Sequence, residues 1–190
     1  MTSKHKTSVV YEQSVNALLV IDVQENYLNP SSFIHIDTTG IDLFLSNMNY
    51  IIDMFSANNN HVIYVVNEWT NPIMNFFTNN VSKKGGEGVG IDNRLNVINN
   101  NIYSKSKPNS LSNKDLLTYL RKNNITDVYV IGLMTEGCIK ATVSGLIKEN
   151  FNVIVVKDAL GYMRAGKHNK TIKKFEKRNI KLIETKDIAL

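Results

Sequence analysis

Apolar residues recur along the chain with two kinds of spacing. Continuous, largely β-branched runs occupy residues 17–21, 61–66, 128–131 and 151–156, and shorter ones lie within 95–103 and 180–183. Runs of this length are typical of strands buried on both faces of a parallel sheet. Between them, apolar residues recur at helical intervals in 41–58, 113–123, 139–147 and the lysine-rich segment that starts at 167.

This alternation of strands and helices predicts an α/β fold. We expect a single-domain, Rossmann-like three-layer αβα sandwich with a mostly parallel sheet of about six strands. The sequence contains no internal repeat and no linker, so residues 1–190 should form one domain. Residues 1–14 should form a polar N-terminal tail.

The ends and the cysteine content bear on location. The chain starts with polar residues that lack the apolar core of a secretion signal, and no apolar run reaches transmembrane length. The one cysteine excludes a disulfide within the chain. These features favour a cytoplasmic protein.

The chain is basic, with 22 Lys and Arg against 17 Asp and Glu, a net charge of +5. Such an excess can attract nucleic acid or acidic membranes. Much of it lies in one helical segment, where Lys170, Lys173, Lys174 and Lys177 share a face. This spacing indicates the solvated side of an amphipathic helix, so we expect neither a nucleic acid nor a membrane as partner.

The segment 128–143 carries the strongest chemical signal. A buried strand ends at Gly132, and a helix is expected to follow with Thr135 as its N-cap. Cys138 would then lie in the first turn, where the helix dipole favours a thiolate. Ligand sites of open α/β sheets lie at this edge. Cys138 is therefore either a nucleophile or a small buried apolar residue.

Two further candidates follow other strands. Asp22 ends the apolar run at 17–21, and Lys105 or Lys107 follows the third run. A carboxylate can act as a base, and an ammonium can hold that carboxylate and stabilise developing negative charge. Cysteine supplies the attacking sulfur.

The sequence around these residues resembles the isochorismatase-like cysteine hydrolases from about residue 17 to 188. The resemblance rests on Asp22-Val-Gln24 after the first strand, Gly132-Leu-Met-Thr-Glu-Gly-Cys138, and Asp158-Ala159. The family lysine precedes a leucine by eleven positions. Counting back from Leu116 gives Lys105, and Lys107 is the alternative because the usual phenylalanine is missing.

The resemblance implies a catalytic triad of Asp22, Lys105 and Cys138. Asp22 would take the thiol proton and pass it to the leaving amine, while the sulfur forms a thioester that water hydrolyses. The backbone N–H groups of Met134 and Cys138 would form the oxyanion hole, next to a cis peptide bond between Leu133 and Met134. No cofactor is implied.

One departure from the family concerns metal. Nicotinamidases of this superfamily have an Asp-x-His pair and a later His as ligands, and these positions hold Asn67, Trp69 and Asn75 here. Asparagine is a poor ligand for a transition metal and tryptophan is none, which predicts the loss of the metal site. Trp69, Tyr27 and Phe33 either wall a substrate pocket or pack in the core.

These observations predict a metal-independent cysteine hydrolase that cleaves a C–N bond of a small amide or ureido compound. The resemblance also suggests a homo-oligomer. A redox sensor could use the same thiol, but it would not need Asp22 and Lys105. A non-catalytic protein that binds a small molecule on the same fold is the other alternative.

Overall fold

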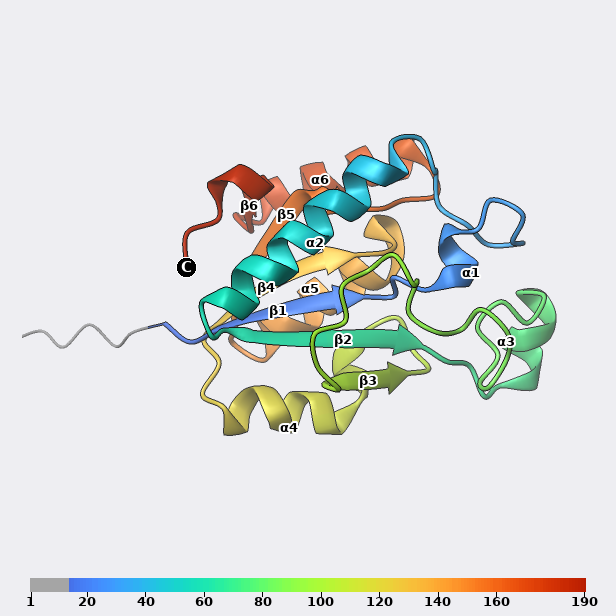
Figure 1. Cartoon of the computed structure of the whole chain (residues 1–190), viewed down its shortest axis with the longest axis horizontal. Coiled ribbons are helices and arrows are strands. Elements are labelled where there is room, and N and C mark those ends of the chain that lie inside the picture. Colours follow the sequence, from blue (N-terminus) through green and yellow to red (C-terminus); the bar gives the residue numbers. More distant parts are fainter. Residues whose placement is uncertain (1–13) are drawn as a thin grey trace, which may run out of the picture.

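The computed structural model describes residues 14–190 and contains a six-stranded, fully parallel sheet (Figure 1). The strand order is β3-β2-β1-β4-β5-β6. The strands are β1 (Asn16–Ile21), β2 (His61–Asn67), β3 (Ile102–Lys105), β4 (Asp127–Gly132), β5 (Asn152–Leu160) and β6 (Lys181–Ile183). The predicted α/β architecture is confirmed.

Helices cover both faces of the sheet. They are α1 (Glu25–Leu28), α2 (Ile41–Ala57), α3 (Pro72–Phe77), α4 (Lys114–Lys122), α5 (Lys140–Lys148) and α6 (Ala165–Lys177). The apolar residues of α2 pack on one face, and those of α4, α5 and α6 pack on the other. None of the helices within 14–190 is long and apolar enough to cross a membrane.

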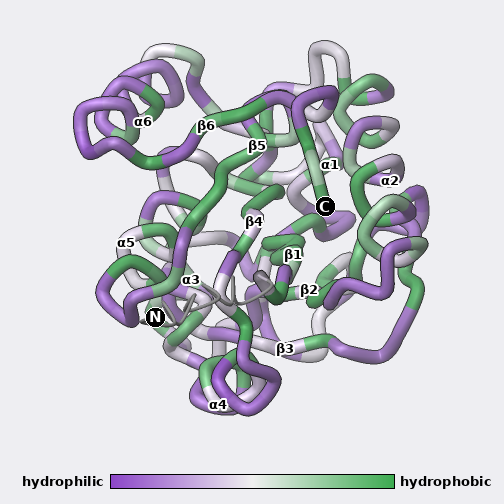
Figure 2. The backbone as a smooth tube through the Cα atoms, turned by 90° about the vertical axis from the view of Figure 1, so that its left-hand side faces the viewer, coloured by the Kyte–Doolittle hydropathy of each residue, from purple (hydrophilic) through white to green (hydrophobic). Residues whose placement is uncertain are grey.

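The central strand β1 separates two apolar cores. All six of its residues are buried. Leu18 and Val20 belong to the core under α2, whereas Ala17, Leu19 and Ile21 belong to the opposite core. This division follows from the two-residue period of a strand. Figure 2 shows apolar strands at the centre of the molecule and largely polar helices around them.

The predicted helices and five of the six predicted strands lie where the sequence pattern places them. The lysines of α6 that share one face are exposed, as expected for a solvated surface. The third strand differs from the prediction, which placed it within residues 95–103. It starts only at Ile102 and ends at Lys105. Asparagine side chains shape the segment before it: Asn99 Oδ1 accepts a bond from the Asn101 N–H at 2.9 Å. Such local bonds compete with strand pairing.

The strand order creates a topological switch point between β1 and β4. The chain builds the sheet outward from β1 through β2 to β3, and then in the opposite direction from β4 to β6. Loops that leave the carboxyl ends of these two strands diverge to opposite faces. Open α/β sheets bind their ligands in this crevice.

Candidate active site

Asp22 lies directly after β1 and is 2% exposed. Its N–H still donates to the carbonyl of Val65 in β2 at 2.8 Å, so the strand pairing holds the residue in place. Its φ of 56° lies in the left-handed region, which aspartate tolerates better than most residues. The chain therefore turns sharply at Asp22 and leaves the carboxylate at the carboxyl edge of the sheet.

Lys105 is the last residue of β3 and reaches the same place across the end of β2. Its side chain is 0% exposed, and its Nζ lies 2.8 Å from Asp22 Oδ2. The same Nζ lies 3.4 Å from Cys138 Sγ. Lys107 is exposed. The structure therefore brings Lys105 to Asp22 and Cys138.

Cys138 follows β4 in a turn of different geometry from the one predicted. Residues Thr135–Ile139 form a single π-helical turn before α5 begins. The predicted N-cap is wrong, because Met134 takes that position and the Thr135 hydroxyl donates to the carbonyl of Gly161 at 3.0 Å. Gly132 has a φ of 118°, and a Cβ there would overlap the backbone of Ile21 in β1. Only glycine fits this close approach.

The side chains of Thr135 and Glu136 fix the π-helical turn against α6 and the loop before it. The Thr135 hydroxyl hydrogen is used on Gly161, so the Nδ1–H of His168 donates to Thr135 Oγ1 at 3.0 Å. Glu136 Oε1 accepts from the N–H groups of Met163 and Arg164, each at 3.2 Å. The segment that carries Cys138 is therefore held from its outer side as well as by β4.

The peptide bond between Leu133 and Met134 is cis, as the family resemblance implies. Within residues 14–190 the Met134 N–H donates to no protein acceptor. This N–H precedes the turn that carries Cys138. An N–H without a protein acceptor is compatible with an oxyanion-hole donor, and that assignment stays a prediction.

Burial and charge together set the protonation of the site. Burial raises the pKa of Asp22, and Lys105 opposes this only in part. Burial and the charge of Asp22 raise the pKa of Cys138 to about 12. Burial alone would lower the pKa of Lys105, but Asp22 and Cys138 reverse this and raise it. Burial and the Asp22 charge therefore favour the neutral thiol, a shift opposite in direction to the one that a helix dipole alone predicts.

Gln24 is a site residue to which the sequence analysis assigns no role. It is 1% exposed, and its Oε1 accepts from the Asn67 N–H at 2.7 Å. Its Nε2 donates to the carbonyls of Asn67 at 3.2 Å and Val89 at 2.6 Å. Gln24 therefore joins the carboxyl ends of β1 and β2. Its place two residues after Asp22 was the one available signal in the sequence. That place alone does not show whether Gln24 is exposed or buried, and only a buried side chain there would need hydrogen-bond partners.

The sequence matches the isochorismatase domain over residues 16–187. The chain belongs to the isochorismatase domain family. It is 29% identical over 144 residues to the uncharacterized isochorismatase family protein YddQ of Bacillus subtilis, and the match covers 75% of this chain and 76% of YddQ.

Solved structures share the fold of this family member at low identity. A cysteine hydrolase from Pseudomonas syringae superposes with a TM-score of 0.82 at 17% identity, covering 91% of this chain and 90% of that one. A pyrazinamidase of Pyrococcus horikoshii in complex with zinc gives 0.78 at 20% identity, with 90% and 99% covered. A nicotinamidase from Bacillus subtilis gives 0.75 at 16% identity, with 89% and 98% covered.

The three positions compared with metal ligands do not fit a transition metal in this family member. Asn67 uses its amide within the protein, since Nδ2 donates to the Tyr27 hydroxyl at 2.9 Å. Trp69 has no ligating atom in its side chain, and Asn75 Nδ2 donates to the Trp69 carbonyl at 3.3 Å. Residues 14–190 hold no cluster of three or more His, Cys, Asp or Glu that could ligate a metal.

The aromatic residues considered for the substrate pocket occupy three different settings. Tyr27 is 2% exposed, and its hydroxyl bonds to Ser82 as well as to Asn67. Its ring therefore packs in the apolar core that also contains the buried residues of α2. Trp69 is half-buried, and its backbone N–H donates to the Ser82 carbonyl at 2.6 Å. Phe33 is 64% exposed.

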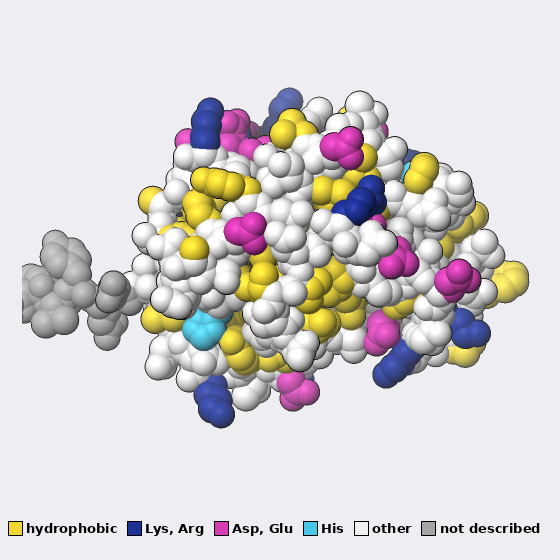
Figure 3. All heavy atoms as spheres, in the orientation of Figure 1, with side chains coloured by type: hydrophobic (Ala, Val, Ile, Leu, Met, Phe, Trp, Pro, Cys, Tyr) yellow, Lys and Arg dark blue, Asp and Glu magenta, His cyan; other side chains and the backbone are white. Residues whose placement is uncertain are grey.

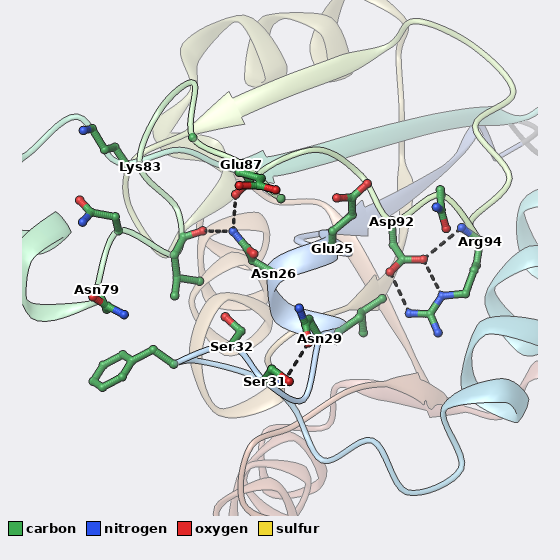
Figure 4. A pocket seen from close by; sticks show the side chains of 17 residues that line it. Glu25, Asn26, Asn29, Ser31, Ser32, Asn79, Lys83, Glu87, Asp92 and Arg94 are labelled. Carbon is green, nitrogen blue, oxygen red and sulfur yellow. Dashed lines mark hydrogen bonds and ion pairs between the residues drawn. The ribbon is translucent and has the colours of Figure 1, made fainter.

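Phe33 lines a polar cavity of about 700 Å³, as do residues of α1. Figure 4 shows this cavity from close by. Asn26 holds the wall of this cavity, because its Nδ2 donates to the carbonyls of Val81 at 2.8 Å and Glu87 at 2.7 Å. Neither Cys138 nor its two partners line it. A direct contact between Phe33 and a substrate at Cys138 stays a prediction.

Proposed function

We propose that this protein is a metal-independent cysteine amidohydrolase acting on a small carboxamide or ureido compound. One observation carries the proposal: the buried contact of Lys105 with both Asp22 and Cys138. Family membership supports it, as do the cysteine hydrolase, pyrazinamidase and nicotinamidase among the proteins of similar fold. The absence of metal-ligating side chains at the positions of Asn67, Trp69 and Asn75 supports the metal-independent chemistry.

In the first half of the reaction, one proton moves from sulfur to the leaving nitrogen, and a C–S bond replaces the C–N bond. Asp22 takes the proton of the Cys138 thiol as the sulfur attacks the amide carbonyl carbon. The carbonyl oxygen becomes an oxyanion that accepts hydrogen bonds from the N–H groups of Met134 and Cys138. Asp22 then gives its proton to the leaving nitrogen. The C–N bond breaks, and an amine and a thioester remain.

The second half hydrolyses the thioester. Asp22 takes a proton from water as the oxygen attacks the thioester carbon. The C–S bond then breaks, the acid leaves, and Asp22 returns the proton to sulfur. The net reaction adds one water to the amide and restores the neutral thiol. Lys105 keeps its charge throughout, because its raised pKa holds the proton.

A redox sensor is less compatible with this site. Reversible oxidation proceeds from an exposed thiolate of low pKa. Cys138 is half-buried, and its pKa is raised to about 12. The arrangement instead provides a base next to a neutral thiol, which general-base catalysis requires.

The test begins with ammonia or amine release from a panel of small carboxamides and ureido compounds. With any substrate found, Cys138→Ala, Asp22→Asn and Lys105→Met should each lower kcat about 10³-fold or more. Double variants should be little worse than single ones, because the loss of one member already disables the nucleophilic route. Lys107→Ala serves as control and should retain near-normal activity, since Lys107 is exposed. Near-normal turnover by Cys138→Ala would refute the mechanism.

A further inference from the structure

The Lys105 ammonium has a complete set of partners. An ammonium has three N–H donors. In this structure Nζ has three acceptors: Asp22 Oδ2 at 2.8 Å, Cys138 Sγ at 3.4 Å and Asn67 Oδ1 at 3.4 Å. Two of these belong to the proposed reaction and the third does not. Because the Lys105 side chain is 0% exposed, no solvent can replace Asn67 as the third acceptor.

A buried chain of neutral groups holds Asn67 in this orientation. Its Nδ2 donates to the Tyr27 hydroxyl at 2.9 Å, so Oδ1 is directed to Lys105. The Tyr27 hydroxyl then has its own hydrogen for Ser82 Oγ, with which it forms a hydrogen bond. Ser82, Tyr27 and Asn67 are 0%, 2% and 3% exposed. Gln24 fixes the Asn67 backbone from both sides.

The neutrality of Asn67 matters as much as its position. The charged or titratable groups that act on Lys105 are Asp22 and Cys138. One proton is shared between them, so one negative charge faces one ammonium. A carboxylate in place of the Asn67 amide would add a second negative charge next to Nζ. The ammonium would then stabilise a sulfur anion less well.

We propose that Asn67 is a positioning residue. Its side chain, oriented by Tyr27 and Ser82, accepts the third N–H of Lys105. Because the Asn67 amide is neutral, it does not compete with Asp22 and Cys138 for the positive charge of the ammonium. The role in turnover rests on the proposed function. The effect on the sulfur does not, because it concerns thiol reactivity alone. It can be measured without a substrate.

The experiment is alkylation of the folded protein by iodoacetamide at pH 8.5, followed by intact-protein mass spectrometry. Cys138 is the one cysteine of the chain, so the label reports a single site. Asn67→Asp should slow labelling about threefold or more. A rise of about one unit in the thiol pKa lowers the thiolate fraction about tenfold, and the higher nucleophilicity of the more basic thiolate offsets part of this loss. Asn71→Asp is the matched control, because Asn71 is exposed and an aspartate there can still cap α3. It should label at the wild-type rate.

Tyr27→Phe is the second variant, and it adds neither charge nor volume. Without the hydroxyl, Asn67 loses its orientation, and the ammonium moves toward Asp22, its closer partner. Labelling should slow about twofold, and any substrate should show a lower kcat at unchanged KM. If Asn67→Asp does not fold, this variant alone decides.

Two outcomes would overturn the proposal. One is a wild-type labelling rate in folded Asn67→Asp or in folded Tyr27→Phe. The other is an equal slowing in Asn67→Asp and Asn71→Asp, which would show an effect of net charge rather than of position. Labelling changes as predicted, with no amine released from any amide, would support the role of Asn67 and refute the amidohydrolase function.

Discussion

At the scale of single residues, the site contains one ammonium group, that of Lys105, and two side chains that can carry a negative charge next to it, those of Asp22 and Cys138. Lys105 contacts both Asp22 and Cys138, so proton transfer from sulfur to carboxylate moves the charge without leaving it unpaired. A buried ion pair is costly to desolvate and adds little to stability by itself. In the proposed mechanism, its value is that the charge can move over the short distance between sulfur and carboxylate.

The raised pKa of Asp22 predicts a pH effect on stability. The folded protein binds this proton more tightly than the unfolded chain does, so the carboxyl contributes less to stability as pH rises from about 4 through its folded pKa. Lys105 stays protonated in both states over this range. Acidification from pH 7 should therefore stabilise the wild type relative to Asp22→Asn, which cannot ionise. Thermal melting of both proteins between pH 4 and 7 measures this.

Activity should change in the opposite direction. The carboxyl must be ionised to accept the thiol proton, so kcat/KM should fall about tenfold per unit below a pKa that lies above the ordinary carboxyl range. Protonation of Asp22 at low pH should therefore stabilise the fold and lower the activity. An acid limb near the ordinary carboxyl pKa, or a constant difference in melting temperature across the range, would contradict the raised pKa.

The residues at Asn67, Trp69 and Asn75 predict that metal is not required. Amine release should survive prolonged treatment with a chelator, because none of these side chains provides a strong ligand for zinc or iron. Elemental analysis of untagged protein should find less than about 0.1 zinc or iron per chain, since structural and catalytic zinc sites use several nitrogen, sulfur or carboxylate ligands. Stoichiometric metal in that sample would sink this expectation.

At the scale of elements, Gln24 predicts how β1 and β2 are joined. Gln24→Ala would leave the Asn67 N–H and the carbonyls of Asn67 and Val89 without their side-chain partner. Each buried polar group left unpaired costs about 1–3 kcal/mol, so the loss of partners for these three groups should lower the free energy of unfolding by about 3–9 kcal/mol. Urea denaturation measures it. Glu25→Ala, one residue on and exposed, should change stability by less than about 0.5 kcal/mol.

The elements with a strong apolar period could be predicted from the sequence. The runs that became β1, β2, β4 and β5 are buried on both sides, and α2 and α4 lie within one residue of their expected bounds. β3 could not be placed, because it has four residues and only Lys105 is buried. The π-helical turn could not be predicted either, since tertiary bonds of Thr135 and Glu136 decide its form.

The site was predictable to the extent that its residues follow strands. Asp22 and Cys138 stand next to long apolar runs, and the family resemblance supplied Lys105. The upward shift of the Cys138 pKa could not be predicted, because it comes from burial and from the nearby Asp22 charge, and both are properties of the folded chain. The roles of Gln24 and Asn67 were not predictable for the same reason. Their partners, from Val89 to Lys105, are distant in the sequence.

At the scale of the whole molecule, α3 predicts self-association. Four of its apolar side chains are exposed: Ile73 at 66%, Met74 at 42%, Phe76 at 81% and Phe77 at 69%. Helix α3 lies at one end of the molecule (Figure 1), where apolar side chains reach the surface among charged ones (Figure 3). Contiguous apolar surface of this kind usually marks a contact with another chain. We expect a homo-oligomer at micromolar concentration in light scattering.

A double change tests whether α3 makes that contact. Phe76→Glu with Phe77→Glu should shift the scattering mass toward 21.5 kDa, the mass of one chain, because two charges at the contact would have to be desolvated. Leu43→Glu, at a residue of α2 that is 68% exposed, is the control and should keep the wild-type mass. A wild-type protein of monomer mass would rule out self-association under these conditions.

The pairing of β1 with β4 has a consequence for synthesis of the chain on the ribosome. Asn16 in β1 pairs with Asp127 in β4, so the partner of the first strand is made 111 residues later. Until then β1 can pair only with β2, and its other edge and both its apolar faces stay incompletely covered. At about 5–20 residues per second, that interval lasts roughly 5–20 seconds. Over this interval the nascent chain exposes its most apolar strand, and it is then that a chaperone would bind it.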